Sequence, residues 1–151
     1  MIDQPERLNF LGIDWGKRNI GIALAHGETR IAIPLLTERN DTGVFERLGK
    51  LIIDERIATV IIGIPSYINR PETEHPGEAF GRKLREKFGV QIAYQDEMFT
   101  TKLAQQQLIQ RGEKHVGQRD DAEAACIILQ QWLDQSDPTD GELSEQHTQA
   151  Q

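Results

Sequence analysis

The chain is poor in several features that define other classes of protein. Its 151 residues contain one cysteine, Cys126, which excludes an intramolecular disulfide and a cysteine-based metal cluster. No apolar run approaches the ~20 residues that cross a bilayer. The first ten residues, MIDQPERLNF, lack the apolar core of a signal peptide. These absences predict a cytoplasmic protein without a membrane partner.

An excess of positive charge is also absent. The chain has 17 Lys and Arg against 24 Asp and Glu, a net charge of −7. Four of those acids lie in residues 135–151, so the rest of the chain has 17 basic and 20 acidic residues, a net charge of −3. A local basic patch is compatible with that balance. We expect residues 1–134 to form one domain and the polar residues 135–151 to be a disordered acidic tail.

Three apolar runs joined by short polar turns open the domain. They predict antiparallel strands at residues 8–14, 20–26 and 30–36. Pro34 within the third run indicates a strand at the edge of the sheet or a strand end.

The remainder of the domain alternates helical and strand patterns. Asp41 or Thr42 is a candidate cap for a helix that presents Val44, Leu48, Leu51 and Ile52 on one face. Further strands are predicted at 58–64 and 90–96, and further helices at 77–88, from Thr100 or Thr101 to 111, and 120–133. The order predicts an α/β fold with a mixed five-stranded sheet, three antiparallel strands followed by parallel ones, flanked by helices.

Carboxylates follow or interrupt this apolar framework at three places. Asp14 ends the first strand, Asp96 and Glu97 end the last, and Asp121 lies on the inward stripe of the final helix. An isolated buried carboxylate is costly, and several together repel one another unless a cation holds them. Each acid alone also has an ordinary interpretation as a turn residue or helix cap. Taken together, they suggest a site for divalent cations.

Four motifs occur in order along residues 8–134: GIDWGKRNIGIA, VIIGIP, DEMFTT and DAEAACIILQQWL. On these motifs the chain resembles the YqgF/RuvX family, whose members are described as Holliday junction resolvases and as nucleases of pre-16S rRNA. The resemblance implies an RNase H-like fold and a metal-dependent nuclease (a hydrolase) that acts on structured nucleic acid. It favours 5′ processing of pre-16S ribosomal RNA, and hence ribosome biogenesis and contact with ribosomal particles.

The resemblance also implies residue roles. Asp14, Glu97 and Asp121 take the catalytic, metal-binding positions, for two Mg²⁺ or Mn²⁺ ions. Since neighbours on a strand point to opposite faces, only one of Asp96 and Glu97 aims at the site. We favour Glu97, and expect Asp96 to bond backbone or orient a neighbour.

Basic and aromatic residues near these acids have open interpretations. Lys17 and Arg18, in the turn after Asp14, are predicted phosphate contacts or else an ordinary solvated turn. Lys102 and Arg119 are predicted parts of a basic rim near Asp121. Trp15 either stacks on a nucleotide or covers the edge of the core.

Two alternatives to an RNA-processing nuclease remain. A four-way DNA junction is the second substrate, and a non-catalytic nucleic-acid-binding module of the same fold is the second class. The first motif also resembles the phosphate-binding hairpin of actin-like ATPases and sugar kinases, but those proteins need a second such domain, which these residues do not contain.

Overall fold

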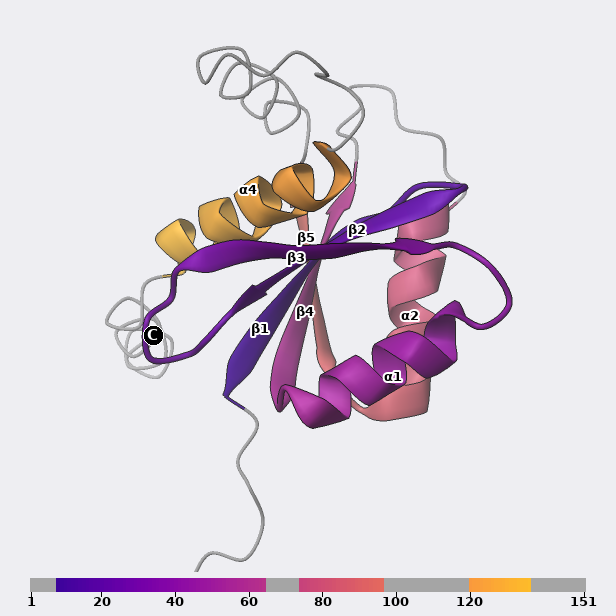
Figure 1. Ribbon diagram of the computed structural model, residues 1–151, viewed down its shortest axis with the longest axis horizontal. Coiled ribbons are helices and arrows are strands. Elements are labelled where there is room, and N and C mark those ends of the chain that lie inside the picture. Colours follow the sequence, from indigo (N-terminus) through magenta and orange to yellow (C-terminus); the bar gives the residue numbers. More distant parts are fainter. Residues whose placement is uncertain (1–7, 65–73, 97–119, 137–151) are drawn as a thin grey trace, which may run out of the picture.

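The computed structural model describes residues 8–64, 74–96 and 120–136. These residues form one five-stranded sheet and three helices (Figure 1). In chain order the elements are β1 (Asn9–Asp14), β2 (Asn19–Ala25), β3 (Ala32–Arg39), α1 (Val44–Asp54), β4 (Ile57–Ile64), α2 (Pro76–Phe88), β5 (Gln91–Asp96) and α4 (Asp120–Gln135).

The strand order is β3-β2-β1-β4-β5, with β1 at the centre. β1 pairs antiparallel with β2 and parallel with β4, while β2–β3 is antiparallel and β4–β5 parallel. The predicted mixed sheet is therefore confirmed. β3 is an edge strand, as Pro34 indicated, and its register with β2 shifts next to that proline.

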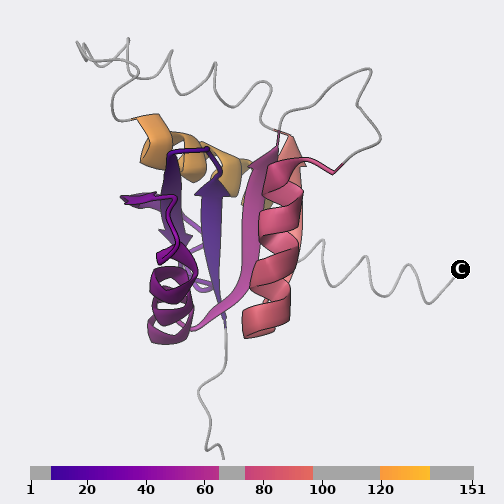
Figure 2. The same cartoon turned by 90° about the vertical axis from the view of Figure 1, so that its right-hand side faces the viewer.

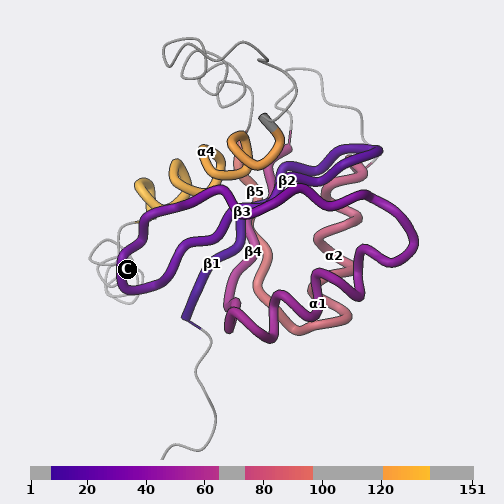
Figure 3. Tube along the Cα trace, in the orientation of Figure 1, coloured from indigo at the N-terminus to yellow at the C-terminus, as the bar shows by residue number. Residues whose placement is uncertain are grey.

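The helices cover the two faces of the sheet unequally. Of the described helices, α1 and α2 lie on one face and α4 lies on the other (Figures 2 and 3). Large aliphatic residues of β1, β2 and β4, such as Ile13, Ile22 and Ile62, pack towards α1 and α2. Alanines of β2 and β3 pack instead against Ile128 and Leu129 of α4. The α4 face is built from small residues, and this allows the helix to lie close to the strands.

Most boundaries shift by one or two residues, and two differences have a clear physical cause. Gly43, and neither Asp41 nor Thr42, is the N-cap of α1, and no side chain caps this helix. The Asp41 Oδ1 instead accepts a hydrogen bond from the Gly43 amide in the preceding turn, at 3.0 Å. β3 continues to Arg39, three residues beyond the predicted end, because its backbone keeps pairing with β2 as far as Asn19.

Side chains of α4 also bond the backbone of the edge strand. The amide of Ala32 donates to Gln130 Oε1 at 2.8 Å, and the Cys126 thiol donates to the Ala32 carbonyl at 3.3 Å. Burial raises the pKa of Cys126 to about 11, so the thiol stays protonated at neutral pH. Trp132, on the same helix, packs against the Phe10 ring with centroids 5.7 Å apart.

Several predictions fall on parts of the chain outside the described residues. They are the helix expected to end at 111, most of the loop after β4, and the tail from 137 onward. Within the described ranges, no helix is both long and apolar enough to cross a membrane.

Candidate active site

Asp14 is the last residue of β1 and is half-buried. It lies directly opposite Gly21 of β2 in an antiparallel pair, and directly opposite residues present their side chains on the same face. The position of Gly21 faces α4, because a Cβ built there would meet the backbone of Asp121. Asp14 therefore extends from the face that α4 covers.

The contact between Gly21 and α4 is a backbone contact. A Cβ on Gly21 would lie 1.9 Å from the carbonyl oxygen of Asp121 and 2.2 Å from its carbonyl carbon, distances that no side chain can occupy. Gly12 of β1 also allows α4 to approach closely, one helical turn further along, since a Cβ on it would lie 2.8 Å from the Ala125 carbonyl oxygen. Two strand glycines thus let the first turns of α4 rest on β1 and β2 themselves.

Asp121 is half-buried in the first turn of α4. It precedes by one helical turn Ala125, which is fully buried against the sheet, so both lie on the inward face of the helix. Asp14 and Asp121, 107 positions apart in the sequence, consequently lie at the same end and on the same face of the sheet. Their predicted role as metal ligands stays a prediction.

The alternation of β5 indicates which face of the sheet Asp96, its last residue, belongs to. The Tyr94 hydroxyl donates to the carbonyl of Glu78 in α2 at 3.1 Å, whereas Ala93 packs with the α4 cluster. Asp96, two residues after Tyr94, falls on the parity that faces α2. Glu97 lies outside the described residues, so its preference over Asp96 stays a prediction.

The carboxylates of the two described acids suit a hard divalent cation. Asp14 and Asp121 offer carboxylate oxygens, the ligands that Mg²⁺ and Mn²⁺ prefer. Among the described residues no group of three or more His, Cys, Asp or Glu could hold a metal. The third predicted ligand, Glu97, is outside them.

Trp15 lies on the opposite side of β1 from Asp14. Its indole packs against the core beneath α1 and α2, and meets the His75 ring edge-on with centroids 6.1 Å apart. His75 is the N-cap of α2 and accepts a hydrogen bond from the Gly77 amide at 2.9 Å. Trp15 therefore covers the edge of the core on the side away from Asp14, as one of its two predicted roles requires.

The turn after Asp14 carries the predicted phosphate contacts. Lys17 and Arg18 are exposed in this turn, three and four residues after Asp14. Gly16 makes the turn possible, since a Cβ on it would lie 2.5 Å from the Asn19 carbonyl oxygen. The other two predicted contacts, Lys102 and Arg119, lie outside the described residues.

Sequence reasoning missed the role of the glycines. The sequence predictions assign no role to Gly21, yet this residue sets the distance between α4 and β2. The signal was present, because Gly21, Ala23 and Ala25 alternate with large residues on one strand. Such alternation indicates a sheet face against which a helix packs closely.

The order of the strands and the arrangement of the helices define an RNase H-like fold. Two solved structures share the fold: T. thermophilus RuvC in complex with a Holliday junction substrate (TM-score 0.53, 19% identity, 82% of this chain and 91% of that one), and the fowlpox virus Holliday junction resolvase (TM-score 0.53, 9% identity, 84% and 98%).

Sequence comparison identifies the family. The model of the family described as "RuvX: Holliday junction resolvase" matches residues 8–135, and the chain belongs to this family of nucleases. Curated relatives named "Putative pre-16S rRNA nuclease" include one from Paraburkholderia phymatum (36% identical, 83% of this chain and 84% of the relative). Another is from Streptococcus gordonii (32% identical, covering 85% of this chain and 99% of the relative).

Proposed function

We propose that this protein is a metal-dependent endonuclease that hydrolyses phosphodiester bonds in structured nucleic acid. The observation that carries the proposal is that the backbone of Asp121 packs on Gly21, and Gly21 is the residue directly opposite Asp14 in the β1–β2 pair. Two carboxylates at one sheet end suit the binding of hard cations that act on phosphate.

Asp14, Asp121 and Glu97 would hold Mg²⁺ or Mn²⁺, and two ions are expected. When bound, such ions supply Lewis-acid stabilisation of the negative charge that develops on a phosphodiester. The fixed strand end and the docked helix keep the two described carboxylates in place without rearrangement. Lys17 and Arg18 would hold neighbouring phosphates, which positions the strand without reading its sequence.

The favoured substrate is precursor 16S rRNA, processed at its 5′ side. The support for this choice is the name shared by curated relatives that match along more than four-fifths of this chain. A substrate of this kind implies work in the cytoplasm, on or near ribosomal particles. A four-way DNA junction is the second candidate, supported by the description of the family and by the names of the structural neighbours.

A cleavage assay with two substrates tests the proposal. The purified chain is incubated with a labelled precursor 16S rRNA fragment or a labelled four-way DNA junction, in Mg²⁺, Mn²⁺ or EDTA. We expect cleavage of the RNA in the presence of a divalent ion and none in EDTA. Cleavage of the junction alone would shift the substrate to DNA. Equal behaviour of the wild type and Asp14→Asn on both would refute the nuclease.

The choice between the two acids after β5 gives a separate prediction. Glu97→Gln is expected to lower the cleavage rate by about 100-fold or more, the cost of losing a metal ligand, whereas Asp96→Asn lowers it less than about threefold. The measurement is the single-turnover rate of both variants over a series of Mg²⁺ concentrations. The reverse ranking would assign the ligand to Asp96.

A further inference from the structure

Three cations gather in a hollow beside the candidate site: Lys17 and Arg18, which the first motif contains, and Arg39, which no motif indicated. The hollow, of about 470 Å³, lies between the β1–β2 turn and the end of β3. It is lined by Lys17, Arg18, Asn19, Arg39, Asn40 and Asp41. Three cations and one carboxylate make this a basic surface on a chain whose net charge is −7.

Arg39 extends from the same sheet face as the two carboxylates. It lies directly opposite Asn19 in the β2–β3 pair, and Asn19 shares its parity with Gly21, which faces α4. β1 and β3 run in the same direction with β2 between them, and Thr37 of β3 is level with Asp14 at the end of β1. Arg39 therefore stands about 12 Å from Asp14, two strand spacings to the side and two residues further along the sheet. A strand bound at Asp14 and extending along this sheet end would pass over Arg39.

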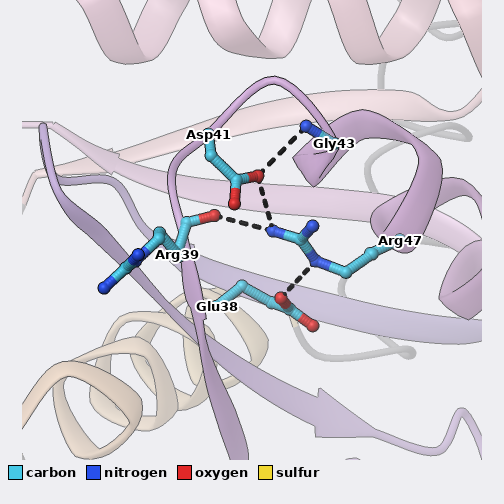
Figure 4. Close-up of polar contacts among 5 residues, drawn as sticks. All are labelled: Glu38, Arg39, Asp41, Gly43 and Arg47. Atoms are coloured by element: carbon cyan, nitrogen blue, oxygen red, sulfur yellow. Dashed lines mark hydrogen bonds and ion pairs between the residues drawn. The ribbon is translucent and has the colours of Figure 1, made fainter.

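The backbone of Arg39 is fixed while its side chain is left available. Arg47 Nη2 donates to the Arg39 carbonyl oxygen at 2.9 Å (Figure 4). The Arg39 guanidinium points away from this network in the same view. On the other side, the Asn40 amide donates to the Arg18 carbonyl at 2.8 Å, and Asn40 Nδ2 donates to the Gly16 carbonyl at 2.8 Å. These bonds tie the two walls of the hollow together.

Arg47 also neutralises the acids nearest to the hollow. Its Nη2 lies 2.9 Å from Asp41 Oδ1, and its Nε lies 2.5 Å from Glu38 Oε1. Hydrogen bonding to Arg47 holds the pKa of Asp41 below its usual value, so this carboxylate is ionised and paired. Arg39 also acts on Asp41 through its charge, but the carboxylate bonds Arg47 directly, so the three cations of the hollow outnumber the acid that lines it. The hollow therefore suits an anion.

We propose that Arg39, together with Lys17 and Arg18, binds a backbone phosphate of the nucleic-acid strand one or two nucleotides from the bond that is cleaved. The inference rests on the proposed function for the identity of the ligand. A guanidinium presents a fork of N–H donors that matches two phosphate oxygens, and phosphate contacts position a strand irrespective of its sequence. Arg39 thus sets the register of the strand on the carboxylates.

The test is a binding measurement that does not depend on cleavage. Wild type, Arg39→Ala, Arg39→Lys and Arg85→Ala are titrated in EDTA with the labelled precursor rRNA fragment and with the four-way junction, between 50 and about 200 mM salt. Arg85 is the matched control, an exposed arginine near the far end of α2 whose removal changes the net charge equally.

We expect Arg39→Ala to weaken binding about five- to tenfold and to reduce the slope of log K against log salt by about one. Arg39→Lys should restore most of the slope, since the charge is kept. Loss with the RNA alone or the junction alone identifies the source of the phosphate. No loss with either, or an equal loss in Arg85→Ala, would overturn the subsite.

Failure of the subsite and failure of the nuclease give different results. If binding depends on Arg39 but the protein cleaves neither substrate, the phosphate subsite is supported and the proposed nuclease function is rejected. Metal-dependent cleavage in a protein whose binding ignores Arg39 keeps the function and rejects the subsite.

Discussion

Replacing Asp14 by Asn is expected to lower the rate of metal-dependent cleavage by at least about 100-fold. The amide keeps the size of the side chain but removes the charge that would hold a cation, and losing even a residue that only orients a ligand costs ten- to 100-fold. Single-turnover cleavage of the precursor rRNA fragment at saturating Mg²⁺ measures the change. The variant should bind the same RNA in EDTA with nearly unchanged affinity.

Thermal unfolding supplies the control for Asp14→Asn. Because Asp14 is half-buried at a strand end rather than in the core, we expect the melting temperature to stay level or rise as repulsion with Asp121 is relieved. A variant that folds, binds RNA and cleaves at the wild-type rate would remove Asp14 from the site.

Replacing Gly21 by Ala should damage both stability and activity. The new methyl would lie 1.9 Å from the Asp121 carbonyl oxygen, which is backbone and cannot rotate away, so the start of α4 must move by more than 1 Å. Overpacking of this kind costs about 1–3 kcal/mol of unfolding free energy. A misplacement of about 1 Å at a catalytic group costs about 100-fold in rate, so activity should fall even where the protein remains folded.

Gly77→Ala is the matched control for Gly21→Ala. A Cβ at Gly77, in the first turn of α2, would lie 3.2 Å from His75 Nδ1, a tight contact but a far milder one than the 1.9 Å at Gly21. Urea unfolding and cleavage rates of the two variants are compared. Gly21→Ala with the stability and rate of the wild type would show that α4 does not need the glycine contact to carry Asp121 to its place.

The framework of the fold could be predicted because its signals are local. Apolar runs with short polar turns fixed the three antiparallel strands, and the β-branched run ending in Ile64 marked a parallel strand buried on both faces. Asp14 and Asp121 stood out because each is a charge next to residues that are fully buried. The motifs then joined them in one family pattern.

Other features depend on contacts between distant segments, which one sequence does not display. The extension of β3 to Arg39 needs the pairing partner Asn19, and the start of α1 is set by Gly43 with Asp41 engaged by Arg47. Neither pairing follows from local propensity. The sequence alone does not show which face of the sheet Asp14 and Trp15 belong to. The structure shows it, because Gly21, the pairing partner of Asp14, lies against α4, and Trp15 packs on the opposite side.

The docking of α4 has a consequence for how the protein folds. Asp14 lies on β1, the first described strand, whereas Asp121 follows 107 residues later on α4, the last described helix. Contacts between segments so far apart in the sequence are slow to form, because the cost in loop entropy has to be met first. The two carboxylates are therefore brought to one end of the sheet only when α4 packs on Gly12 and Gly21, and a partly folded chain would hold one acid without the other.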